Sequence, residues 1–193
     1  MLNENDQKTI LNYARAVLEA HLQEKSEPVF PSNVDAALFD ERRGIFVTLK
    51  IGKQLRGCIG QILGYQPLRE SLPEMTCAAA FGDPRFPPVT LEELKSVKLH
   101  ISLLTVPKPV RSFNDIRLGT DGIIVTYGRK KGVYLPEVAT ETGWSQKEFF
   151  TSCALEKAGL SANKMEKALI EVFQTEGFEE EGYSFPSKGS KNS

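Results

Sequence analysis

A cysteine and an arginine two residues apart, Arg56 and Cys58, are the side chains of this sequence best suited to chemistry. In a β-strand, residues at this spacing point to the same face, with their Cα atoms roughly 6.5 to 7 Å apart. Arginine is always cationic, so it would stabilise a nearby thiolate, which is the nucleophilic form of cysteine. We therefore treat the two as a candidate catalytic pair, with Cys58 as a nucleophile or redox thiol.

Two glycines next to this pair, Gly57 and Gly60, are candidate binding positions. A glycine in a strand lets a ligand or another backbone approach closely. Cys58 also has a simpler interpretation, because free cysteine is among the residue types most often buried in protein cores. The sequence leaves both interpretations of Cys58 open, a reactive thiol and a packed side chain.

A proline-rich loop, residues 83–88 (Asp-Pro-Arg-Phe-Pro-Pro), supplies two more candidate binding residues, Asp83 and Arg85. A residue that precedes proline is restricted to extended conformations, so the loop is stiff. The acid and the base could contact a ligand together, or they could pair with each other and anchor a bend. A functional role requires the loop to lie beside Arg56 and Cys58.

His100 is a further candidate binding residue and the histidine that could act as a base for Cys58. It shares a predicted strand face with Ser102. No local spacing requires a chemical role, and a packed or surface imidazole is the simpler explanation.

Several classes of function lack their signatures in this sequence. It contains no GxxxxGK[ST] loop, no GxGxxG after a strand, no HExxH and no GxSxG. The two distant histidines and three scattered cysteines argue against a zinc site, so the sequence identifies no metal site and no cofactor. Charges nearly balance, with 24 basic and 25 acidic residues, which disfavours nucleic-acid binding. The basic run at residues 129–131 is better explained as a solvated hairpin tip.

Cysteine usage and hydropathy predict a cytoplasmic protein without a membrane anchor. The three cysteines form no CxxC pair and no even framework, as expected of reduced thiols. The N-terminus is polar and acidic, unlike a secretory signal, and no apolar run approaches the length that spans a membrane.

Hydrophobic periodicity predicts the elements that position the candidate residues. Helical patterns cover residues 5–22, 66–81 and 145–158, with a short helix from Thr90 and a kink or late start near Pro73; strand patterns cover residues 45–51, 54–62, 97–106, 123–127 and 133–135, while 168–172 fits either state. The first two strands form a hairpin through Gly52. Its pleat places Arg56 and Cys58 on one face and leaves Leu55 and Ile59 to the core.

Hairpin-connected strands separated by unrelated helices indicate an α+β fold with an antiparallel-rich sheet and flanking helices. No repeat of 20–50 residues and no Gly/Ser linker divides the chain. We therefore expect a single domain over residues 1–186, followed by a flexible tail at 187–193.

Seven short segments in a fixed order carry a resemblance. They are Leu55-Arg-Gly-Cys-Ile-Gly60, Asp83-Pro-Arg-Phe-Pro-Pro88, Ser102-Leu-Leu104, Gly119-Thr-Asp-Gly122, Tyr134-Leu-Pro-Glu-Val138, Gly143-Trp144 and Lys157-Ala-Gly-Leu160. Together they resemble the AMMECR-one protein family, whose hallmark is the first hexapeptide. The resemblance implies a larger lobe built from both chain ends, a smaller inserted lobe, and a cleft near the hexapeptide. It implies no established activity.

The resemblance carries four positions over as functional, namely Arg56, Cys58, Asp83 and Arg85. It also implies a shared pathway with Memo-like and radical-SAM proteins, beside which prokaryotic members are encoded. Two features depart from the family pattern. His100 stands where an acidic residue is expected, and no tryptophan follows Leu160.

Two functions remain compatible with these observations. The first is a cytoplasmic enzyme that acts on a small molecule or a protein side chain, using a cleft around Arg56 and Cys58, with Arg85 holding a small anionic ligand. The second is a non-catalytic protein-binding module that acts with Memo-like and radical-SAM partners. The sequence does not decide whether the protein is an enzyme.

Overall fold

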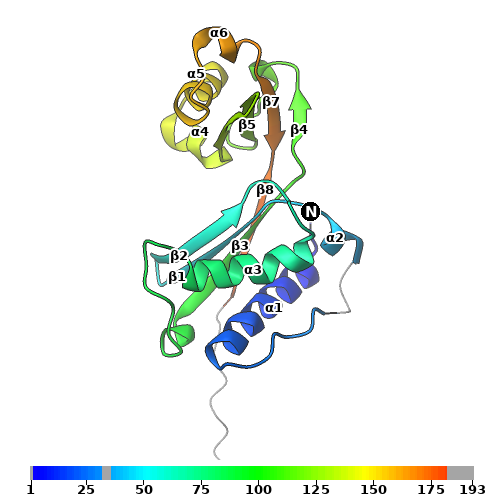
Figure 1. The fold of residues 1–193 in the computed structure, drawn as a ribbon, viewed down its shortest axis with the longest axis vertical. Coiled ribbons are helices and arrows are strands. Elements are labelled where there is room, and N and C mark those ends of the chain that lie inside the picture. Colours follow the sequence, from blue (N-terminus) through cyan, green and yellow to red (C-terminus); the bar gives the residue numbers. More distant parts are fainter. Residues whose placement is uncertain (1, 32–35, 182–193) are drawn as a thin grey trace, which may run out of the picture. The chain divides into compact units, whose positions relative to one another are not determined.

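The computed structural model describes residues 2–31 and 36–181, and its chain divides into two compact units (Figure 1). The first and larger unit comprises the chain up to Ser102 and the part from Gly177 onward, and the second is Leu103–Glu176. Each contains a four-stranded sheet with helices, so the fold is α+β, with the smaller unit inserted into the larger one as expected. The predicted tail at 187–193 lies outside the described residues.

The first unit is built on a sheet with strand order β2-β1-β3-β8. Its elements are α1 (Glu4–Leu22), α2 (Ala36–Asp40), β1 (Ile45–Ile51), β2 (Gln54–Gln61), α3 (Leu68–Phe81), the 3-10 turn η1 (Glu93–Lys95), β3 (Val97–Leu104) and β8 (Thr175–Glu179); the last two strands continue past the unit boundaries. Because β2 is the outer strand of this order, one of its two hydrogen-bonding edges is not paired with another strand of the sheet.

The β1–β2 hairpin forms as the sequence predicts. Gly52 adopts a positive φ of 60° in its turn, a conformation that glycine reaches without a steric cost. Every second residue of β1 from Ile45 to Leu49 is buried, and Figure 1 shows α1 and α3 on the same side of this sheet. Leu55 was expected in the core but is 41% exposed, because it lies next to the turn where the register shifts between Leu49 and Lys50.

Helix α3 corrects one expectation. It begins at Leu68, directly after Pro67, and continues through Pro73, so the predicted late start near Pro73 is wrong. Pro73 is the sixth residue of α3, beyond the first turn in which proline is tolerated, so its missing N–H removes the α-helical hydrogen bond to the Arg69 carbonyl oxygen. The helix continues despite this loss.

A buried ion pair joins distant segments of the first unit. Arg15 of α1 forms a bidentate ion pair with Glu180, through Nε and Nη2. It also donates hydrogen bonds to the carbonyl oxygens of Leu94 and Val97, at 3.2 and 2.7 Å. Glu180 in turn accepts the backbone N–H of Leu99 at 2.9 Å. The two charged side chains are only 5% and 9% exposed. The pair therefore ties α1, β3 and the segment after β8 into one core.

The second unit has a sheet with strand order β4-β7-β5-β6. Its elements are β4 (Lys108–Val110), η2 (Phe113–Asp115), β5 (Gly122–Tyr127), β6 (Lys130–Tyr134), α4 (Pro136–Thr142), α5 (Gln146–Ser152), the π-helical turn η3 (Cys153–Lys157), α6 (Ala162–Met165) and β7 (Leu169–Phe173). The segment that fitted either helix or strand is β7, since its residues complete this sheet between β4 and β5.

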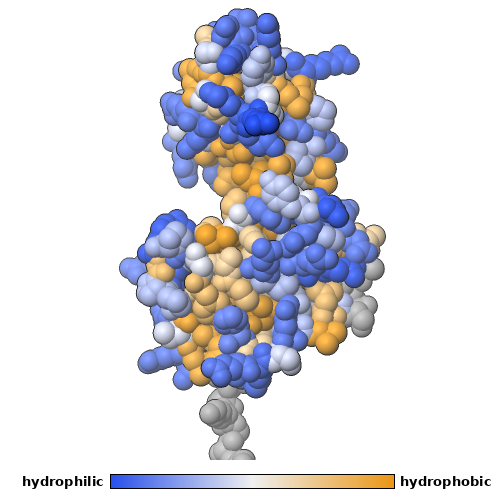
Figure 2. Space-filling view, in the orientation of Figure 1, coloured by the Kyte–Doolittle hydropathy of each residue, from blue (hydrophilic) through white to orange (hydrophobic). Residues whose placement is uncertain are grey.

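The surface agrees with the mixed composition. Figure 2 shows polar and charged residues over much of the visible face, with smaller apolar areas between them. None of the described helices is long and apolar enough to cross a membrane.

Candidate functional site

Cys58 lies in the middle of β2, directly opposite Thr48 of β1. Its side chain is half-buried on the sheet face opposite the core, as the alternation in β2 predicts. The thiol sulfur lies 3.1 Å from the Thr48 hydroxyl, a contact in which either atom can donate. The thiol is therefore not a core side chain: it contacts a hydroxyl on a partly open face.

The proline-rich loop (residues 83–88) lies along the outer edge of β2. The backbone N–H of Cys58 donates to Asp83 Oδ2 at 2.8 Å, and Arg85 Nη2 donates to the Cys58 carbonyl oxygen at 3.1 Å. These are the two backbone groups that a further strand would pair with. One carboxylate and one guanidinium thus take the place of a neighbouring strand at Cys58, and cover an exposed edge that favours aggregation.

Asp83 and Arg85 also bind each other through two side-chain hydrogen bonds of 2.9 and 2.7 Å. The Asp83 side chain is 2% exposed and that of Arg85 is 55% exposed. The hydrogen bonds from Arg85 hold the pKa of the Asp83 carboxyl well below its usual range. The same bonds, with smaller contributions from the Asp83 charge and the Cys58 thiol, raise the pKa of Arg85. Of the two alternatives for this loop, the structure shows the mutual pair that anchors a bend, and this pair adjoins Cys58. Contact of the two side chains with a ligand stays a prediction.

Arg56 is paired elsewhere. Its guanidinium binds the Glu93 carboxylate through two hydrogen bonds of 2.7 and 3.0 Å, and donates to the Pro88 carbonyl oxygen at 3.3 Å. Phe86 has the Arg56 and Arg85 guanidinium carbons 6.0 and 5.6 Å from its ring centroid. In the described part of the chain, Nη1 makes no hydrogen bond in either arginine. Arg56 Nη1 is buried, whereas the Arg85 side chain is 55% exposed, so Arg85 is the guanidinium with an accessible donor beside Cys58.

The Arg56–Glu93 pair gives a pH-dependent prediction. Hydrogen bonds from Arg56 lower the pKa of Glu93 to about 2, so this pair stabilises the fold above the usual glutamate range near 4.5. That stabilisation is lost as the pH falls through about 2. We expect Glu93→Gln to lower the urea midpoint at pH 7, with a difference from wild type that shrinks steadily below pH 4.5. The exposed neighbour Glu92 supplies the control, Glu92→Gln, and an undiminished Glu93→Gln effect at pH 2 would contradict the assignment.

The two glycines serve close packing. A Cβ atom at Gly57 would overlap the carbonyl oxygen of Ala79 in α3, and one at Gly60 would overlap the Ile45 carbonyl oxygen and the Phe46 ring. Of the two approaches that the sequence allowed, a ligand or another backbone, the structure places a backbone at Gly57.

His100 lies on β3, with β1 between it and β2. Its Nε2 is 3.2 Å from Ser102 Oγ, and its Nδ1 is 3.8 Å from Glu179 Oε2. Burial, followed by the charge of Lys50, lowers the pKa of His100. The His100 imidazole makes no hydrogen bond to Cys58. With Ser102 and Glu179 it forms a second polar group on the same sheet face.

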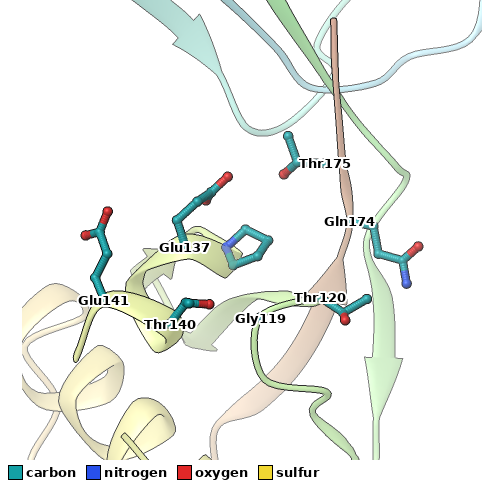
Figure 3. Close-up of a pocket in the computed structure, with 8 residues that line it drawn as sticks. Gly119, Thr120, Glu137, Thr140, Glu141, Gln174 and Thr175 are labelled. Atoms are coloured by element: carbon teal, nitrogen blue, oxygen red, sulfur yellow. The ribbon is translucent and has the colours of Figure 1, made fainter. Parts of the chain in front are cut away.

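A hollow that sequence reasoning missed lies in the second unit. It measures about 520 Å³ and is lined by Gly119, Thr120, Pro136, Glu137, Thr140, Glu141, Gln174 and Thr175. Figure 3 shows the Glu137 and Glu141 carboxylates projecting from α4 on one side of it. None of the predicted site residues lines it. The glycine turn at 119–122 was the available signal, because Gly119 has a positive φ of 73° and allows a close approach of the chain.

The described residues contain no group of three or more histidine, cysteine, aspartate or glutamate side chains arranged to hold a metal ion. The site at Cys58 brings together a thiol, a hydroxyl and a guanidinium, a set suited to nucleophilic attack on, or binding of, an anionic molecule.

Comparisons with known proteins extend over most of the chain. The AMMECR1 family model matches residues 11–178. A protein of Methanothermobacter thermautotrophicus is 40% identical over 189 residues, which covers 94% of this chain and 97% of that protein. Protein MJ0810 of Methanocaldococcus jannaschii is 40% identical over 182 residues, or 88% of each. The crystal structure of uncharacterized protein PH0010 from Pyrococcus horikoshii gives a TM-score of 0.75 at 33% identity, covering 93% of this chain and 94% of that one.

Proposed function

The chain belongs to the AMMECR1 family, and on this premise we propose that it is a cytoplasmic enzyme with Cys58 as its nucleophile. Its substrate is a small anionic molecule or a protein side chain that carries an anionic group. The observation that supports this proposal best is the half-buried Cys58 thiol, which contacts the Thr48 hydroxyl and adjoins the half-exposed Arg85 guanidinium. A fixed guanidinium beside the sulfur is a binding group for an anionic substrate next to the attacking atom.

The roles of the neighbouring groups follow from their contacts. Arg85 uses Nε and Nη2 on Asp83 and on the Cys58 carbonyl, which fixes the guanidinium and leaves Nη1 to bind a substrate anion. The Thr48 hydroxyl positions the sulfur through its 3.1 Å contact. Arg56 acts at a distance, because its ion pair with Glu93 supports the segment that follows the proline-rich loop.

The test is the rate of alkylation of each cysteine at neutral pH. Burial raises the pKa of Cys77, and burial raises the pKa of Cys153 to about 12, so both serve as internal slow controls. We expect iodoacetamide to label Cys58 at least about 100-fold faster than Cys153, and about fivefold faster than glutathione. Peptide mapping by mass spectrometry assigns the rates. Labelling of Cys58 no faster than glutathione would refute the nucleophile.

Arg85→Gln tests the electrostatic half of the proposal. Because it removes the cation beside the sulfur, we expect labelling of Cys58 in this variant to slow to the glutathione rate. The exposed Arg42, which donates to the Tyr65 carbonyl oxygen, supplies the matched control Arg42→Gln, for which the wild-type rate is expected.

A second function is a non-catalytic binding module for Memo-like and radical-SAM proteins. The observation that favours it is the mutual pairing of charges around Cys58, which is typical of a rigid surface. In this case the 55% exposed Arg85 is a surface contact, and Arg85→Ala abolishes co-purification with such a partner while Arg42→Ala does not. Unchanged co-purification of the Arg85 variant would refute this surface.

A further inference from the structure

We propose that the same sheet face carries a second nucleophile, Ser102, with His100 as its base and Glu179 as the residue that orients the imidazole, and that this group cleaves ester-type acyl substrates. This activity goes beyond the thiol chemistry proposed for Cys58 and uses none of the residues assigned there.

His100 lies between the other two side chains, with Ser102 near one ring nitrogen and Glu179 near the other. Ser102 Oγ is 3.2 Å from His100 Nε2, within the range of a nucleophile and its base, and His100 Nδ1 is 3.8 Å from Glu179 Oε2. Ser102 and His100 are two residues apart on β3 and so share a face, while Glu179 comes from the neighbouring β8. All three belong to the first unit.

The imidazole is held in place by the backbone of β8. A Cβ atom at Gly177 would lie 3.2 Å from both Cε1 and Nε2 of His100, so the ring packs directly against this glycine. His100 and Ser102 are both half-buried. The ring therefore has little freedom to leave Ser102, as a base requires.

One tautomer suits this arrangement. To accept the Ser102 proton, Nε2 must be unprotonated, which places the proton on Nδ1. Nδ1 is buried and makes no hydrogen bond in the described part of the chain, and Glu179 is the carboxylate nearest to it in those residues. The Glu179 side chain is 61% exposed, so rotation of this side chain can close the remaining gap when substrate binds.

The surroundings of His100 favour its neutral form near pH 7, because they lower its pKa from 6.5. Burial is the largest cause that lowers the pKa of His100, and the Lys50 ammonium on β1 lowers it further. Glu179 on β8 acts in the opposite direction. A neutral imidazole is the form that can take a proton from serine. Lys98, two residues before His100 on the same strand face, is exposed and adds a second cation to the half-buried Lys50, so the face suits an ester that carries a negative charge.

The reaction is an acyl transfer in two steps. Ser102 Oγ attacks the ester carbonyl carbon as its proton passes to His100 Nε2, and the C–O bond to the leaving alcohol breaks while that alcohol takes the proton from Nε2. Water then attacks the acyl-serine, gives a proton to Nε2, and releases the carboxylic acid as Ser102 recovers its proton. No oxidant, metal or cofactor enters the balance.

The experiment uses a fluorophosphonate probe, with which an activated serine displaces fluoride and keeps the phosphonyl group. We expect one adduct per chain on Ser102 by peptide mapping, none in Ser102→Ala, and an unchanged adduct in Ser26→Ala, a matched change at an exposed serine. His100→Gln should slow labelling about 100-fold or more, with its fold checked by circular dichroism.

The pH profile tests Glu179 as a positioning residue. The wild-type rate should rise as His100 loses its proton, with a midpoint below the ordinary value of 6.5, and should then stay level. Glu179→Gln should move that midpoint to lower pH, because it removes the charge that raises the pKa of His100. Absence of an adduct on wild-type Ser102 at pH 8 would overturn the proposal. Iodoacetamide labelling of Cys58 is a separate readout, so either nucleophile can fail alone.

Discussion

Replacing Arg15 by methionine is expected to lower the free energy of unfolding by about 3–5 kcal/mol, because the change leaves a buried carboxylate without its cation. Glu180 is 9% exposed and would keep only the Leu99 N–H among the partners described for it. The carbonyl oxygens of Leu94 and Val97 would lose their donor as well. Urea unfolding followed by circular dichroism measures the loss.

An exposed ion pair of the same unit supplies the control. Arg69 and Asp40 form a pair whose side chains are 41% and 61% exposed, and Arg69→Met should cost less than about 1 kcal/mol. The double variant Arg15→Met with Glu180→Leu should recover part of the loss, because it removes the stranded charge. An Arg15→Met effect as small as that of Arg69→Met would show that the pair is not buried.

Gly57→Ala is expected to cost about 3 kcal/mol, near the upper end of the usual overpacking range. The added methyl group would overlap the Ala79 carbonyl oxygen, a backbone atom within α3 that no side-chain rotation can move. Either α3 or β2 must shift, and β2 carries Cys58. We therefore expect a lower urea midpoint together with a changed alkylation rate at Cys58.

Gly82→Ala is the matched control at the end of the same helix. A Cβ atom there would lie 3.1 Å from the Ala78 carbonyl oxygen, which requires an adjustment of only a few tenths of an ångström. We expect it to leave the Cys58 alkylation rate unchanged. Equal effects of the two glycine variants on stability and on alkylation would contradict the close approach of α3 to β2.

The sequence predicted best the elements whose signals are local. The hairpin around Gly52 needed only alternation and a glycine turn, and β1 has the predicted bounds. The reciprocal bonds of Thr90 and Glu93 were visible as a four-residue pattern, although the helix they begin is a single 3-10 turn. The short strands β4 and β8, which lack such signals, were missed. Helix α4 was missed as well, although Pro136 at its first position and the left-handed Gly143 after its last residue are local signals of a helix.

Partners far apart in the chain could not be predicted from spacing. Arg15 and Glu180 are 165 residues apart, and nothing local distinguishes this arginine from a surface residue of an amphipathic helix. The Glu93 carboxylate accepts the backbone N–H of Thr90, three residues before it, and also binds Arg56, 37 residues away. Such pairs depend on how the sheet and helices pack, which a single sequence does not encode in any short window.

The candidate site was predicted in part. Cys58, Asp83 and Arg85 do lie together, as the loop hypothesis required. The Arg56 and Arg85 guanidinium carbons lie 6.0 and 5.6 Å from the centroid of the Phe86 ring. Their roles as catalytic and binding residues stay predictions. The sequence favoured Arg56 as the cation for Cys58, because it could not show that Glu93 binds Arg56 while Arg85 adjoins the thiol.

The proline-rich loop binds β2 at position 58 through the backbone, so the structure there does not depend on the reactive side chain. Asp83 accepts the backbone N–H of this residue, and Arg85 donates to its carbonyl oxygen. Neither hydrogen bond depends on which side chain stands at position 58. A serine or an alanine there would present the same two backbone groups to the loop. Exchanging Cys58 thus changes the reactive atom while the frame that holds it persists, so a loss of reactivity in such variants reports on sulfur itself.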